Sequence, residues 1–182
     1  MQRTISWLLG TEGFWTDRRA SAATEMALVL PGIAFILLNV VDLGVYIYTR
    51  MQVDLAAQEA VGAARVLCDT TAELPATTNC GGTLSSTMTS AAQNTTLGSN
   101  VTLGSPSEAY YCANSSGTLV QVAATNATPP ANCSATLSGS TSKPGDYISV
   151  TASYNFTPVF PGASVASLMP ATIQRTAWMR LQ

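Results

Sequence analysis

Met26–Val41 reads MALVLPGIAFILLNVV, sixteen consecutive residues without a charge. If Asp42 is allowed inside the run, the apolar stretch extends to Tyr48 and is 23 residues long. About 20 apolar residues are enough for a helix to cross the roughly 30 Å hydrocarbon core of a bilayer. We therefore expect a transmembrane helix over residues 21–49. The alternative is a helix buried in the core of a soluble domain.

Basic residues lie on the N-terminal side of this run. Arg18 and Arg19 precede it, and Lys and Arg are enriched on the cytoplasmic side of membrane spans. The chain is therefore expected to cross the membrane once, with its N-terminus in the cytoplasm and everything after Tyr48 outside. Residues 1–20 then form a short leader on the cytoplasmic side.

The helical pattern continues beyond the apolar run, with no turn signal before Pro75. Small apolar residues recur at helical spacing on one face, and polar residues cover much of the remainder. The apolar face consists of Val53, Ala56, Ala57, Ala60, Ala63, Ala64 and Leu67. We expect an exported helical stalk over residues 50–69, as the second part of one helix from about Thr24 to Leu67. Its alanines either let a separate element approach closely or pack under the globular part of the same chain.

Residues 70–142 have a different composition, with 27 Ser or Thr among 73 positions. Such a segment is expected to be rich in loops. Two short apolar stretches within it, Glu108–Ala113 and Thr118–Ala124, are bounded by Asn, Ser and Gly and predict strands.

Strict alternation of apolar and polar residues follows the turn at 143–146. It predicts one strand over residues 148–156 and, after a break rich in Pro and Gly, a second over residues 171–181. We expect these strands to pair as an antiparallel meander in a β-rich head over residues 70–182. The predicted fold class is α+β: a long N-terminal transmembrane helix with a stalk, followed by a small antiparallel β-rich head.

Composition excludes several classes of function. Charged residues make up 10% of the chain, against about a quarter in typical domains, and the net charge is −2. No basic patch can neutralise a run of phosphates, so nucleic acid is not an expected partner. The chain has no histidine, which excludes Ser-His-Asp and Cys-His catalysis and His-containing zinc sites. We expect no enzyme activity, no catalytic residue, no cofactor and no metal.

The chain has four cysteines: Cys68, Cys80, Cys112 and Cys133. No two of them form a C-x-x-C motif, and they fit a protein of an oxidising compartment. Four cysteines allow three pairings. We favour Cys68 with Cys80 and Cys112 with Cys133, because both disulfides close short loops. Each would contribute about 3 kcal/mol to a head with a modest core.

A single carboxylate stands where the basic leader joins the apolar run, in Ala20-Ser21-Ala22-Ala23-Thr24-Glu25-Met26. This motif resembles the cleavage site of type IV prepilins. In that family a membrane prepilin peptidase cuts on the cytoplasmic side of the apolar segment and leaves glutamate as the fifth residue of the mature chain. Counting back from Glu25 places the cut between Ala20 and Ser21. Family members usually have glycine before the cut, where this chain has Ala20.

Further motifs resemble TadE-like proteins of the Tad (Flp) pilus system. They are TEMALVLP at Thr24–Pro31, the alanine-rich Ala56–Arg65, VTASYNFTP at Val150–Pro158 and AWMR at Ala177–Arg180. The resemblance is strongest over residues 18–67 and 147–181. It implies a pilin-like fold and a minor pilin or pseudopilin, anchored in the bacterial inner membrane with a periplasmic head, that helps to assemble a surface pilus for adhesion. The implied partners are the prepilin peptidase, other pilin subunits through the N-terminal helix, and the lipid bilayer.

Two acids in the apolar helix are candidate functional residues. The Glu25 carboxylate is costly in lipid, and so is a new N-terminal ammonium on Ser21 of a neighbouring subunit; pairing neutralises both and would set the axial register between subunits. The alternative for Glu25 is a carboxylate at a helix start that is stabilised by the helix dipole. Asp42 either makes a contact inside the membrane or reaches the outer interface.

Two other functions remain open from the sequence. One is a type II secretion pseudopilin, which shares the plan of a helix followed by a head. The other is a membrane-anchored extracytoplasmic binding module whose variable middle zone recognises a surface or ligand without assembling.

Overall fold

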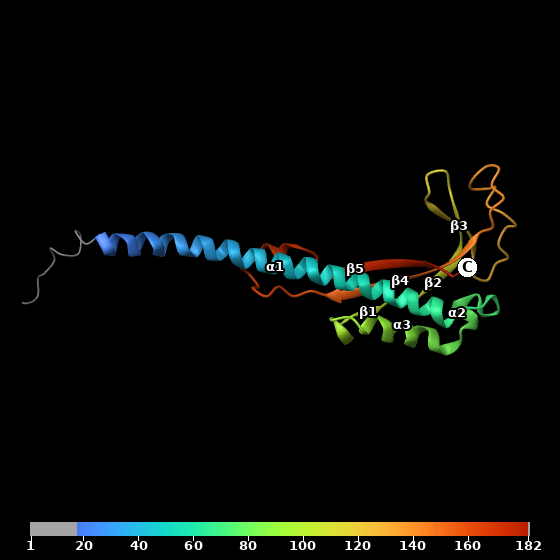
Figure 1. Ribbon diagram of the computed structural model, residues 1–182, viewed down its shortest axis with the longest axis horizontal. Helices are drawn as coiled ribbons and strands as arrows, with labels where there is room; N and C mark the ends of the chain where they lie inside the picture. The colour runs from blue at the N-terminus through green and yellow to red at the C-terminus, as the bar shows by residue number, and fades with distance from the viewer. Residues whose placement is uncertain (1–17, 182) are drawn as a thin grey trace, which may run out of the picture.

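The computed structural model describes residues 18–181, apart from the side chains of residues 18–21 and 81. A single helix, α1 (Arg18–Leu67), is 50 residues long and forms a rod. The rest of the chain gathers around the C-terminal half of this rod, and the N-terminal half projects beyond it (Figure 1). Most of the leader predicted for residues 1–20, up to position 17, lies outside the described residues.

The helix passes through Pro31 without a break and ends at Leu67. The sequence prediction of one continuous helix from the apolar run into the stalk is therefore confirmed. Within Ala22–Leu67 lies a window of 18 residues with a mean hydropathy of 2.2, of which only 6% is buried. By length and composition, this part of α1 is a candidate membrane span.

An antiparallel sheet forms the head. Its strands within the described residues are β1 (Thr102–Leu103), β2 (Ser107–Ala113), β3 (Leu119–Ala124), β4 (Gly145–Asn155) and β5 (Thr172–Arg180). β4 is the centre of the sheet, because it pairs with β5 along one edge and with β2 and β1 along the other. β3 pairs only with β2 and extends the sheet outward. The predicted α+β fold and the strands expected from β2 to β5 are confirmed. The expected meander was wrong, because β4 pairs with β2 and not with its predecessor β3.

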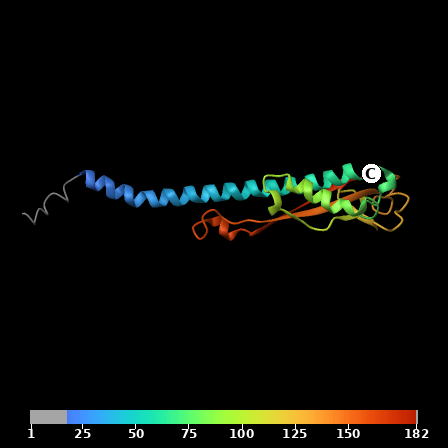
Figure 2. The same cartoon turned by 90° about the horizontal axis from the view of Figure 1, so that it is seen from below.

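Short helices occupy the segment that the sequence analysis treated as loops. α2 (Ala76–Asn79) and α3 (Leu84–Gln93) follow α1, and α3 lies alongside it (Figure 2). The sequence predicted a segment rich in loops, and it did not predict these helices. The buried residues of α3, Leu84, Met88 and Ala92, lie four positions apart on one face. Serines and threonines occupy five of the six positions between them, and this composition hid the helical period.

The core lies between α1, α3 and the sheet. The buried face of α1 consists of Val53, Ala56, Ala57, Ala60, Val61 and Ala64. The facing sheet residues are Ile148, Val150, Ala152, Ile173 and Ala177. Alanines on the helix let the backbone of the sheet approach closely while the larger side chains come from the strands. Of the two alternatives left open for the stalk, its alanines pack under the globular part of the same chain.

Two disulfides close the head. Cys68 at the end of α1 is bonded to Cys80 after α2, with 5.9 Å between the Cα atoms. Cys112 on β2 is bonded to Cys133 in the segment between β3 and β4, with 5.6 Å between the Cα atoms. This is the pairing favoured from the sequence, and it ties the loop-rich segment to the helix and to the sheet.

Candidate functional site

Asp42 joins the apolar part of α1 to a distant part of the chain. Its side chain is completely buried. Oδ1 accepts a hydrogen bond from the backbone N–H of Val159 at 2.8 Å, and Oδ2 accepts one from the backbone N–H of Phe160 at 3.2 Å. A carboxylate is a strong acceptor, so one side chain holds two consecutive amides.

Asn39 lies one turn before Asp42 and makes a second connection to the same segment. Its Oδ1 accepts from the backbone N–H of Val165 at 2.7 Å. Its Nδ2 donates to the carbonyl oxygen of Ala163 at 3.3 Å and to that of Phe35, in its own helix, at 2.8 Å. Asn39 and Asp42 lie three positions apart, so they share one face of the helix.

These contacts hold residues 156–171, which we name the C-terminal loop, against α1. The loop includes the 3-10 helix η4 (Val165–Leu168) and connects β4 to β5. At its base, the Phe156 ring packs edge to face on Tyr46, with 5.1 Å between ring centroids. Figure 2 shows the loop, in red, lying beside α1 at the end of the head that faces the projecting half of the helix.

Asp42 was a candidate from the sequence, but its hydrogen-bond partners and the role of Asn39 were not predicted. An Asn and an Asp three positions apart inside an apolar helix were the available signal, because such residues need buried hydrogen-bond partners. The amides that satisfy Asp42 lie 117 and 118 positions later in the chain, so no local pattern could have pointed to them.

Glu25 lies on the projecting half of α1, where its side chain is exposed. Apolar side chains surround it on the helix surface, including Met26 and Leu28. The backbones of Ala20 and Ser21 belong to the first turns of the same helix. Glu25 and Asp42 are 17 residues apart, about 26 Å along the axis, so α1 does not bring the two acids together.

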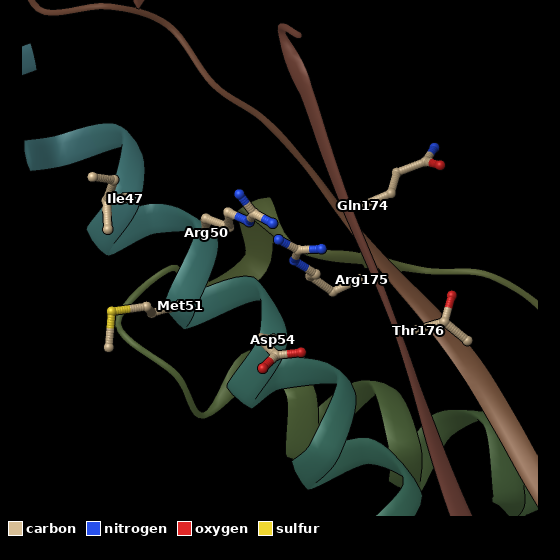
Figure 3. Close-up of a pocket in the computed structure, with 7 residues that line it drawn as sticks. All are labelled: Ile47, Arg50, Met51, Asp54, Gln174, Arg175 and Thr176. Carbon is tan, nitrogen blue, oxygen red and sulfur yellow. The ribbon is translucent and has the colours of Figure 1, made fainter. Parts of the chain in front are cut away.

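A polar hollow of about 650 Å³ lies between α1 and β5, beyond the end of the apolar run. It is lined by Ile47, Arg50, Met51, Asp54, Gln174, Arg175 and Thr176. Figure 3 shows the guanidinium groups of Arg50 and Arg175 side by side between the two elements, with the Asp54 carboxylate one turn further along α1. The two cations give this face of the head a local positive charge next to the apolar helix.

The head also contains a pair of buried acids, Glu108 on β2 and Asp146 on β4. Glu108 accepts hydrogen bonds from the backbone N–H groups of Ala76 and Thr77, both at 2.7 Å, and from the Thr77 hydroxyl at 2.6 Å. These hydrogen bonds fix the start of α2 on the sheet.

Asp146 is in a different position, because neither of its side-chain oxygens has a hydrogen-bond donor. Burial, reinforced by the negative charge of Glu108, raises the pKa of Asp146 to about 7. Burial, followed by the charges of Asp146 and Glu108, also raises the pKa of Tyr110. Within residues 18–181, no group of three or more carboxylate or cysteine side chains is arranged to hold a metal ion.

Asp42→Asn should release the C-terminal loop. The Asn side chain keeps one acceptor oxygen and has an NH2 donor in place of the other. One loop amide therefore loses its acceptor, the second keeps only a neutral one, and a hydrogen bond to a charged group contributes about 1.5–3 kcal/mol. We expect the loop to open roughly 10- to 100-fold more often. Elastase cleavage within residues 156–171, mapped by mass spectrometry, measures this opening. Asp54→Asn, on the same helix, is the control, and equal cleavage of the two variants would contradict the anchoring role.

Asp146 should make the stability of the head depend on pH. Its folded-state pKa of about 7 lies above the ordinary value of 3.8, so the folded head binds the proton more tightly. The stabilisation from this proton is complete below about pH 4, falls as the pH rises and is lost above about pH 7.

The test is urea unfolding of the full chain in detergent between pH 4 and pH 8. Asp146→Asn should remove most of the decline and be more stable than the unsubstituted chain at pH 8. Asp69→Asn, at an exposed position, should retain the decline. A decline of the same size in Asp146→Asn would show that another group is responsible.

Comparison with known proteins gives one match. Residues 20–61 match the family model described as TadE-like protein, whereas no curated protein and no solved structure matches the chain. The matched part of the chain contains Glu25, Asn39 and Asp42, and it extends through the apolar half of α1 into the alanine face. The head beyond residue 61 lies outside the match. Residues 20–61 are thus a TadE-like segment, similar to proteins of the Tad pilus system.

Proposed function

We propose that the chain is a minor pilin or pseudopilin of a Tad (Flp) pilus. In this proposal α1 anchors it in the bacterial inner membrane, with the head on the periplasmic side, and the protein helps to assemble a surface pilus used for adhesion. Its action is the packing of helices between subunits, without catalysis. The TadE-like segment and the candidate membrane span support this proposal.

The bare N-terminal half of α1 is the observation that carries it. Every residue from Ala22 to Leu37 is exposed, and Leu28 is 82% exposed. A rod of exposed apolar side chains is not stable in water and needs either lipid or other apolar surfaces around it. A membrane before assembly, and neighbouring helices after it, would provide these two environments in turn.

Glu25 would guide the move of α1 from lipid into contact with neighbouring helices. A cut between Ala20 and Ser21 would leave a new ammonium at the first turn of α1, about 6 Å along the axis from Glu25. Both charges are costly in lipid, and pairing Glu25 with the ammonium of a neighbouring subunit would neutralise them. The pair would then select one axial stagger between adjacent helices.

The head fits a location outside the cytoplasm. Its two disulfides persist in oxidising compartments such as the bacterial periplasm. Arg18 and Arg19 before the span favour the orientation that would place the head there. The prepilin peptidase is the proposed partner for the removal of residues 1–20.

Glu25→Gln should impair assembly without preventing membrane insertion. The neutral amide cannot compensate a neighbouring ammonium, so we expect the pili recovered by shearing to fall about tenfold or more, while the chain remains in the membrane fraction. Glu59→Gln, at an exposed position of the stalk, is the matched control and should leave pilus yield unchanged. A Glu25→Gln strain with full pilus yield would remove the proposed role of this carboxylate.

A further inference from the structure

The C-terminal loop exposes apolar side chains although it is packed on α1. Val159 is 54% exposed, Val165 55% and Leu168 84%. The sequence from Tyr147 to Gln174 contains no charged residue. Large apolar side chains without neighbouring charges are unusual at a water-facing surface, so this loop has the composition of a segment that contacts an apolar environment.

The position of the loop makes its apolar surface continuous with that of the candidate membrane span. A shallow apolar groove of about 380 Å³ runs between the helix and η4. Its lining consists of Phe35, Ile36, Asn39, Val40, Leu43, Val165, Ala166 and Met169. Figure 2 shows that the loop is the part of the head closest to the projecting half of α1. Lipid or neighbouring helices that surround the projecting half of α1 would therefore also contact the loop.

Eight backbone N–H groups of the loop have hydrogen-bond partners inside the molecule, which lowers the cost of placing this irregular segment near lipid. Asp42 accepts from two of them and Asn39 from a third. The loop itself supplies further acceptors, for the N–H groups of Phe156, Ala163, Ala166, Ser167 and Met169. Pro158, Pro161 and Pro170 have no N–H. Irregular backbone is tolerated near hydrocarbon only where its polar groups are satisfied in this way.

Helix length agrees with a membrane edge at the loop. Asn39 lies 20 residues after Arg19, about 30 Å along α1, which equals the usual thickness of the hydrocarbon core. An outer edge at Tyr48 would instead place the ends of β4 and β5, which lie near Tyr46 and Phe156, inside the bilayer.

We propose that the C-terminal loop is a lipid-contacting element of the head. Its tip, Ala163–Met169, lies in the outer interface of the membrane, and Val165 and Leu168 enter between phospholipid acyl chains. The outer edge of the span is then close to Asn39. The overlap with the helix, from Phe35 to Asn39, is about 6 Å deep, which is the depth at which interfacial elements bury their apolar face. Asp42 and Asn39 set that depth by holding the loop at one height on the helix.

The test uses the full chain with Leu168→Cys, labelled with the fluorophore NBD and reconstituted in phosphatidylethanolamine and phosphatidylglycerol vesicles. The native cysteines are bonded in disulfides, so without reductant the label attaches at the new position. We expect a blue-shifted emission and stronger quenching by lipids with a nitroxide near the headgroup than by lipids with a nitroxide at the chain end. Val66→Cys, 80% exposed on α1 and about 40 Å from Asn39, should show neither effect.

Three results would overturn the proposal. If aqueous iodide quenches the label at Leu168 as readily as the label at Val66, the loop faces water. Stronger quenching from the chain end than from the headgroup would move the edge of the span outward, towards Tyr48. Protection that appears only at high protein-to-lipid ratio would mean that a second copy covers the loop. The vesicles contain no pilus system, so the outcome is independent of the proposed assembly function.

Discussion

α1 is one unbroken helix whose two halves carry different surfaces, and the head is built on the second of them. Its first half presents large apolar side chains on all sides, which suits lipid or other helices. Its second half presents a narrow face of alanine and valine, and β4, β5 and α3 pack on that face. The larger side chains of the core come from the sheet, so the head forms around the helix without interrupting it.

The change from one environment to the other takes place at Asn39 and Asp42. A buried carboxylate without partners would destabilise the structure by several kcal/mol. Here two loop amides donate hydrogen bonds to the Asp42 carboxylate, and a third loop amide donates to Asn39. The same hydrogen bonds therefore offset the free energy of burying the Asp42 carboxylate and hold an irregular loop in place. This arrangement explains why polar residues interrupt an otherwise apolar helix at this height, and it places an uncharged loop next to the candidate span.

Local patterns in the sequence predicted much of this fold. Three features could be recognised from residues close together in the sequence: the length of the apolar run, the alternation in β4 and β5, and the spacing of the cysteines. α3 was missed because Ser and Thr at its exposed positions obscured a period carried by only three buried residues. β1 is two residues long and pairs with Ser153 and Ala152 of β4, too short to leave a pattern.

The candidate site was harder to predict, because its contacts join distant segments. Asp42 was recognisable by its position in the apolar run, but its role as an acceptor for Val159 and Phe160 depends on the path of β4 and β5. Likewise, Glu108 and Asp146 are ordinary surface residues by composition. They become a buried pair, with a raised pKa for Asp146, only because β2 and β4 are neighbours in the sheet.

In the proposed function, α1 enters assembly as a helix freed of its leader, with Glu25 near its new N-terminus. Mass spectrometry of the N-terminus of the chain, purified from membranes of cells with an active prepilin peptidase, tests it most directly. We expect a mature chain that begins at Ser21, with Glu25 as its fifth residue. An intact chain that still carries residues 1–20 in those cells would contradict it and would favour an anchored module that does not assemble.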